Sequence, residues 1–86
     1  MPRISEFYGI AIYMYFRDHA PPHFHAIYGD YEAEVLIAGG AIKAGKLPRR
    51  AATLVEEWTQ LHQQELMQNW RGAQAGAPLQ PIDPLV

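Results

Sequence analysis

The fold is decided by residues 23–37, which read HFHAIYGDYEAEVLI. Apolar or aromatic residues fill alternate positions on both sides of Gly29-Asp30, a pattern typical of strands that bury one face. Glycine at the first of two central residues favours a tight type II′ turn. The stretch therefore predicts a β-hairpin in which Tyr28 pairs with Tyr31.

The hairpin register decides what surrounds the histidines. Counting outward from the turn places His25 opposite Glu34 and His23 opposite Leu36, and a shift of one residue would reverse both faces. One face is then apolar and should lie under a helix, while His23, His25, Glu32 and Glu34 share the other. His25 beside Glu34 is either an acid–base or metal-binding pair, or an ordinary cross-strand pair on a solvated face.

The segments before and after the hairpin complete the predicted sheet. Residues 10–16 are β-branched or aromatic throughout, which predicts a strand with both faces covered. Residues 1–7 are expected to form an extended lead-in. Ala38-Gly39-Gly40 interrupts the strand pattern, and residues 41–45 are expected to form a short fourth strand or a loop.

Residues 47–71 predict one long helix. Pro48 suits the first turn of a helix, and Gly72 follows Arg71 at the end. The apolar residues that recur at helical spacing are Ala51, Leu54, Val55, Trp58, Leu61, Leu66 and Trp70. His62 lies within this stripe and is expected to be a core residue, remote from the hairpin histidines.

Together these elements predict one α+β domain spanning residues 1–86. A small antiparallel sheet of three to four strands, in residues 1–45, is packed by one long C-terminal helix. Residues 72–86 contain three prolines and should form an extended tail.

The composition, 49% hydrophobic and 19% charged, is that of a globular protein. The chain contains no apolar run near 18 residues and no secretory signal pattern, so we expect a cytoplasmic protein without membrane contact. It contains no cysteine, so any metal would be bound by His, Asp or Glu.

The densest chemistry lies in residues 17–26, RDHAPPHFHA. Histidine carries protons near neutral pH and is the commonest metal ligand, but this spacing matches no standard zinc or haem signature. The candidate ligands for a divalent zinc, nickel or manganese ion are Asp18, His19, His23 and His25. The candidate catalytic residues for proton transfer are His23, His25 and Glu34.

A second candidate site is basic and comprises Lys43, Lys46, Arg49 and Arg50. Cations at a helix N-terminus suit phosphate or RNA, although charge runs of this kind usually belong to an ordinary solvated loop. The net charge of −2 argues against general nucleic-acid binding. The sequence contains no P-loop, dinucleotide-binding or serine-nucleophile motif.

Several motifs resemble a known family across nearly the whole chain, from Pro2 to Leu85. The matching motifs are Ile4-Ser5-x-Phe7-x-Gly9-Ile10, Met14-Tyr15-Phe16-x-Asp18-His19-x-Pro21-Pro22-His23-Phe24-His25, Gly45-x-Leu47-Pro48-x-Arg50-Ala51, Glu57-Trp58, Leu61-His62 and Asn69-Trp70. They resemble the bacterial domain-of-unknown-function family 4160 (DUF4160). The resemblance implies no defined reaction. Because genes of this family often lie beside those of domain-of-unknown-function family 2442, it implies a protein partner in a regulatory or toxin–antitoxin-type pair.

Three functional hypotheses follow. The first is a cytoplasmic interaction module in a two-gene regulatory or toxin–antitoxin-like system, binding a partner of the family 2442 type or forming a homodimer. The second is a histidine-dependent hydrolase, such as an RNA-cleaving toxin that holds phosphates with Lys46, Arg49 and Arg50. The third is metal binding for sensing or structure.

Overall fold

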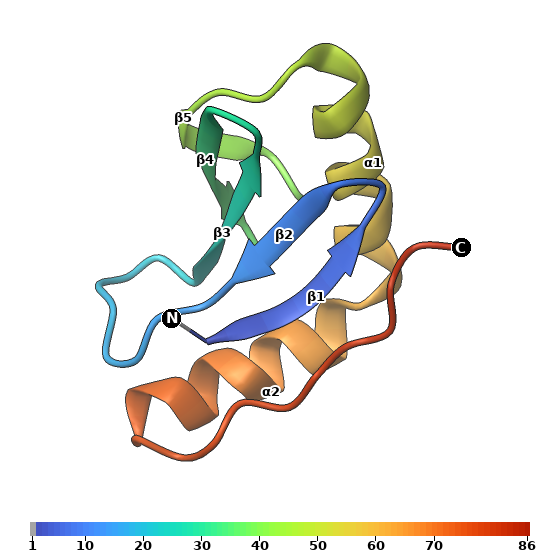
Figure 1. Ribbon diagram of the computed structural model, residues 1–86. Helices are drawn as coiled ribbons and strands as arrows, with labels where there is room; N and C mark the ends of the chain where they lie inside the picture. The colour runs from blue at the N-terminus through green and yellow to red at the C-terminus, as the bar shows by residue number, and fades with distance from the viewer. Residues whose placement is uncertain (1) are drawn as a thin grey trace.

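The computed structural model describes residues 2–86 and shows an α+β protein with a five-stranded antiparallel sheet (Figure 1). The strands follow one another in chain order across the sheet. They are β1 (Arg3–Phe7), β2 (Ile10–Tyr13), β3 (His23–Tyr28), β4 (Tyr31–Leu36) and β5 (Ile42–Gly45), followed by the helices α1 (Arg49–Leu61) and α2 (Gln63–Gln74).

The expected sheet of three to four strands is wrong, because the N-terminal lead-in is itself a strand. β1 pairs with β2 through a tight turn at Tyr8-Gly9, where both residues have positive φ, 50° and 78°. Glycine adopts this conformation without steric cost, and it allows the chain to reverse within two residues. Residues 42–45 pair with β4 as the fifth strand.

The hairpin register predicted from residues 23–37 is confirmed. Tyr28 pairs with Tyr31, His25 with Glu34, and His23 with Leu36. Gly29 has a φ of +59°, as the first central residue of the expected turn requires. The alternation of side chains therefore holds along both strands.

The expectation of one long helix over residues 47–71 is also wrong, because the helix breaks at His62, whose backbone has φ −122° and ψ 31°. A straight 25-residue helix would be about 37 Å long, whereas the longest dimension of the molecule is 33 Å. Two helices of different direction can both cover this short sheet (Figure 1). The side-chain amide of Gln63 donates to the carbonyls of Ile37 and Thr59 at the break.

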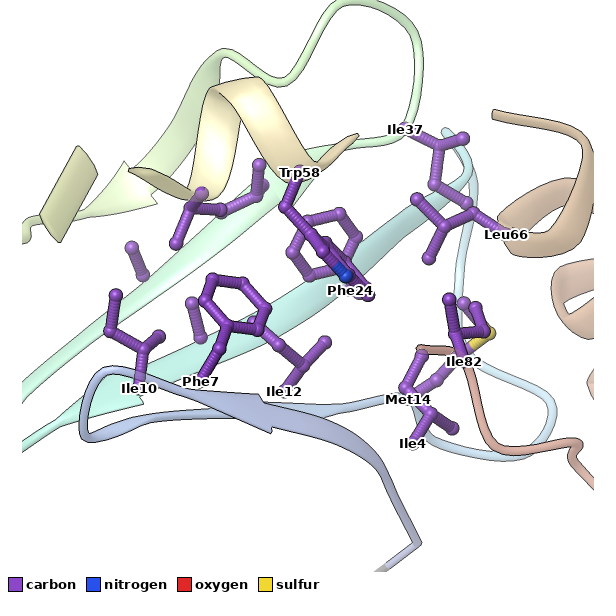
Figure 2. Packing of buried hydrophobic residues seen from close by; sticks show 14 of the residues in the cluster. Ile4, Phe7, Ile10, Ile12, Met14, Phe24, Ile37, Trp58, Leu66 and Ile82 are labelled. Carbon is purple, nitrogen blue, oxygen red and sulfur yellow. The ribbon is translucent and has the colours of Figure 1, made fainter. Parts of the chain in front are cut away.

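The hydrophobic core lies between one face of the sheet and the two helices (Figure 2). Trp58 of α1 is fully buried at its centre, with ring centroids 5.2 Å from Phe7 and 5.6 Å from Phe24. Leu66 carries the core onto α2. Leu61, which the sequence placed on the apolar stripe, is 67% exposed because it precedes the break.

The tail after α2 lies along the body of the molecule, beside β1 (Figure 1). The backbone N–H of Ile82 donates to the carbonyl of Ile4, and the indole N–H of Trp58 donates to the carbonyl of Asp83. Asn69 makes two hydrogen bonds to the backbone of Gln80. Within the described chain, neither helix is long and apolar enough to span a membrane.

Candidate metal centre

The loop between β2 and β3 folds back so that Asp18 faces the start of β3. Two hydrogen bonds tie this loop to the last turn of α2: the N–H of Arg17 donates to the carbonyl of Ala73 (3.2 Å), and Gln74 Nε2 donates to the carbonyl of Asp18 (2.9 Å). Arg17 has a positive φ of 53°, a conformation that L residues rarely adopt. The loop is therefore held in an unusual conformation by defined contacts.

Three ligand atoms converge where this loop meets β3. Asp18 Oδ2 lies 3.0 Å from His23 Nε2 and 3.4 Å from His25 Nε2. One ligand atom from each of these residues lies within 4.8 Å of the others. Ligand bonds of about 2.0–2.1 Å at tetrahedral angles separate neighbouring ligand atoms by about 3.3 Å. The two distances from Asp18 Oδ2, 3.0 Å and 3.4 Å, lie close to this separation.

The buried ring of His23 has a fixed orientation. Its Nδ1 lies 2.7 Å from the carbonyl oxygen of Pro21, which can only accept, so Nδ1 carries a proton. In a neutral ring Nε2 then presents a lone pair, yet it faces Asp18 Oδ2 and lies 3.3 Å from Glu34 Oε1. Neither Nε2 nor Glu34 Oε1 has a hydrogen-bond partner. A cation, either a second proton or a metal ion, would relieve this repulsion.

His25 has a similar arrangement. Its Nδ1 lies 3.5 Å from Glu32 Oε2, long for a hydrogen bond but an ion-pair distance, while Nε2 points to Asp18. The Tyr15 ring packs edge-on against His25 with centroids 4.4 Å apart. Nε2 is hydrogen-bonded to Asp18 Oδ2, and Nδ1 has no hydrogen-bond partner. A metal ion at Nε2 would replace that hydrogen bond and move the ring proton to Nδ1, where Glu32 is the nearby acceptor.

The carboxylate of Asp18 is oriented by its neighbour. Its Oδ1 accepts the backbone N–H of His19 at 2.8 Å and lies 2.9 Å from His19 Nδ1, so Oδ2 is left to face the two histidines. Partial burial alone would raise the pKa of Asp18. Hydrogen bonds from the His19 backbone and the His25 ring, with the charges of His23 and His19, outweigh burial and lower that pKa. The carboxylate is therefore held in its ligand form.

The site is shielded but reachable. The side chain of His23 is 0% exposed, that of His25 13% and that of Asp18 17%. Burial first, and then the negative charges of Glu32 and Asp18 and the neighbouring Tyr13, raise the pKa of Tyr15, so its phenol stays protonated at neutral pH.

The structure brings together three of the four predicted ligands. His19 lies outside the cluster, with its side chain 73% exposed, and contacts only the outer oxygen of Asp18. Glu34 contacts His23 rather than the directly opposite His25, whose carboxylate partner is Glu32. Glu34 is thus close enough to influence His23 but is not part of the converging set.

His23 corrects the expectation that the hairpin histidines point away from the helices. Its ring lies 5.3 Å from that of Trp70, because the chain changes direction at His62 and α2 then brings Trp70 to this ring. His62 itself is remote from the cluster, as expected, and contacts Glu65 and Trp58. Four contacts of the site escaped the sequence-based prediction: Tyr15, Trp70, Gln74 and the Pro21 carbonyl. Of these four, only Tyr15 could have been found from the sequence, because the alternation of side chains along residues 10–16 places it on the same face as Tyr13.

The basic residues lie apart from the histidines. Lys43, Lys46, Arg49 and Arg50 are all exposed. Arg50 lines a small cleft with Tyr28, at the end of β3, whereas His23 begins this strand. Five residue steps of about 3.3 Å separate these two ends by roughly 17 Å. The arrangement does not bring the cations to the imidazoles.

The clefts of the described surface also lie elsewhere. Five are lined by residues of the Tyr8 turn, β3, β5, the two helices and the tail, and none of these linings includes Asp18, His23 or His25. The cluster is a shielded group of ligand atoms rather than the floor of one of these pockets.

Comparison with known proteins identifies one family. A family model described as "Domain of unknown function (DUF4160)" matches residues 9–71, a range that contains the whole cluster. The chain has no significant match to a curated protein or to a solved structure.

Proposed function

The chain belongs to the DUF4160 family, and from this premise we propose that it binds one divalent transition-metal ion through Asp18 Oδ2, His23 Nε2 and His25 Nε2. The observation that carries the proposal is the buried Nε2 of His23. It faces two carboxylate oxygens while the Pro21 carbonyl engages the other ring nitrogen. A metal ion would satisfy the lone pair and the Asp18 carboxylate, and its positive charge would attract the nearby Glu34 carboxylate.

The donor set favours particular metals. Two imidazole nitrogens and one carboxylate oxygen suit zinc or nickel, whereas calcium and magnesium prefer shells of oxygen. Manganese, also considered from the sequence, ranks lower because it prefers oxygen-rich sites. With three protein ligands, a water molecule or another group would complete the shell.

The surroundings favour sensing or a structural role over RNA cleavage. A nuclease needs cations that hold phosphates next to the reacting atoms. Here the carboxylates of Glu32 and Glu34 flank the cluster, while Arg50 lies toward the opposite end of β3. The absence of cysteine is consistent with a reducing compartment, and we propose a cytoplasmic location.

Metal stoichiometry tests this function. The purified chain is stripped with a chelator, dialysed against zinc or nickel, and analysed for bound metal. The wild type should retain one ion per chain, and Asp18→Asn, which keeps the shape but loses the charge, should lose at least about 100-fold in affinity. Asp30→Asn, in the exposed Gly29-Asp30 turn, is the matched control. Equal retention by the wild type and both variants, or retention by none of the three proteins, would refute the function.

A second candidate function, an interaction module, is favoured by the outer face of the sheet. Tyr13, Ile27 and Leu36 lie there half-buried, on the face of His25, and Glu32 is 57% exposed beside them. We propose that this face binds a basic surface of a partner protein. The partner expected from the sequence is the product of the neighbouring gene. Glu32→Lys should abolish co-purification with that product, whereas Glu57→Lys on α1 should not. Failure of the wild type to form a complex with that product would refute the interaction hypothesis.

A further inference from the structure

We propose that metal binding tightens the docking of the last turn of α2 and of the tail, so that the C-terminal segment reports metal occupancy. This inference rests on the proposed metal site. It starts from Asp18, whose side chain belongs to the cluster while its backbone carbonyl accepts a hydrogen bond from Gln74 at 2.9 Å. One residue therefore joins the ion to the helix.

The loop makes further contacts with the same end of α2. The Arg17 N–H donates to the carbonyl of Ala73, and the guanidinium lies so close to Gly76 that an added Cβ would be 2.9 Å from it. Behind the cluster, His23 packs on Trp70. Ligands on both the loop and β3 thus lie against one helix end.

The helix end leads directly into the tail. The backbone N–H groups of Ala77, Gln80 and Ile82 donate to Gly72, Asn69 and Ile4, so the start of the tail is held by α2 and its middle by β1. Ile82 is buried against the core. Loosening the last turn of α2 would therefore release the tail from its start, first at Ala77 and then at Gln80 and Ile82 further along.

Metal binding should bond Asp18 and the two histidines to one ion and thereby fix the loop against α2. In the metal-free protein the opposed lone pairs of His23 and Asp18 would favour a looser loop. By thermodynamic reciprocity, any contact that metal binding strengthens must in turn strengthen metal binding. Gln74 is then a positioning residue for the metal, although it does not touch the ion.

Two measurements on the full chain test the coupling. Amide hydrogen exchange, with and without saturating zinc, should show slower exchange at Ala77, Gln80 and Ile82 when zinc is bound. Gln74→Leu should lower zinc affinity by about three- to five-fold, the share expected of one exposed hydrogen bond, and reduce the zinc-dependent protection. Gln68→Leu, exposed on the same helix, should change neither. The Co²⁺ absorption spectrum should keep its shape in Gln74→Leu, since the ligands are unchanged.

The outcomes separate the two claims. Stoichiometric zinc binding with unchanged tail exchange, or with wild-type affinity in Gln74→Leu, overturns the coupling and leaves the metal site intact. Failure of the wild type to bind zinc or nickel overturns the metal site and the coupling with it. Slower tail exchange with zinc that Gln74→Leu weakens supports both.

Discussion

His23 Nε2 lies 3.0 Å from Asp18 Oδ2, on a ring whose other nitrogen is already bonded to the Pro21 carbonyl. Two acceptors at this distance repel unless a cation lies between them. The ring has no freedom to turn away, because it is fully buried and packs on Trp70. A proton on Nε2 or a metal ion between the two atoms would remove this repulsion.

Acidification should remove the stabilising effect of Asp18. Its pKa is lowered in the folded protein, so the unfolded chain takes up the proton first. The stability it contributes is present above its ordinary value of 3.8 and is lost as pH falls through the lower folded value. In metal-free urea unfolding, the stability difference between wild type and Asp18→Asn should shrink between about pH 5 and about pH 2. A difference that stays constant over this range would contradict the effect.

Removing the carboxylate behind His25 should weaken metal binding without removing a ligand. Glu32 Oε2 lies 3.5 Å from His25 Nδ1, where it would hold the ring proton once a metal ion replaces the hydrogen bond between Nε2 and Asp18. Glu32→Gln should therefore lower zinc affinity by roughly 10-fold in a chelator competition assay. Glu57→Gln, exposed on α1, is the control. If both variants bind zinc equally, Glu32 has no such role.

Gly45 should tolerate no side chain. It has a φ of +76°, and an added Cβ would lie 2.2 Å from the carbonyl oxygen of Glu32, a backbone atom that cannot move aside. Gly45→Ala should destabilise the protein by roughly 2–4 kcal/mol in chemical denaturation. At Gly29, also at positive φ but with nothing within 4 Å, alanine should cost only about 1 kcal/mol. Equal losses at the two sites would show that backbone conformation alone matters.

The two hydrogen bonds of Asn69 should be needed to hold the C-terminal tail against α2. Its side chain donates to the carbonyl of Gln80 and accepts the N–H of the same residue, and it is buried. Asn69→Asp keeps the acceptor but sets a carboxylate against a carbonyl. Hydrogen exchange at Gln80 and Ile82 should accelerate, and stability should fall by about 1–3 kcal/mol. Unchanged exchange at these amides would mean that the tail is held by its apolar contacts.

The hairpin could be predicted from sequence because its information is local. A two-residue turn with glycine and strict alternation on both sides fix the register, and the register of β3 against β4 is confirmed. β1 was missed because its partner is set by the Tyr8-Gly9 turn, in which a tyrosine with positive φ gives no turn signal. The helix break was missed because it depends on the size of the folded molecule, which is shorter than one straight helix would be. No proline or glycine at His62 marks the break in the sequence.

The candidate site was predictable in its members but not in its geometry. The crowding of Asp18, His23 and His25 in ten residues is visible in the sequence. Which oxygen of Asp18 faces the rings depends on His19, and the loop position depends on α2, 56 residues further along the chain. Such long-range contacts leave no periodic pattern. Three inferences from the sequence stay predictions: which metal is bound, which protein is the partner and which class of reaction, if any, is catalysed.

The most direct test observes the imidazole nitrogens themselves. Long-range ¹H–¹⁵N correlation spectra of the histidines are recorded on the chelator-treated chain and again after adding one equivalent of zinc. The account predicts that His23 has a protonated Nδ1 before and after zinc is added, and that zinc shifts the Nε2 resonances of His23 and His25 toward metal-bound values. The exposed His19 and the remote His62 should not change. Spectra in which zinc moves no histidine, or moves His19 and His62 equally, would contradict a metal site at Asp18, His23 and His25.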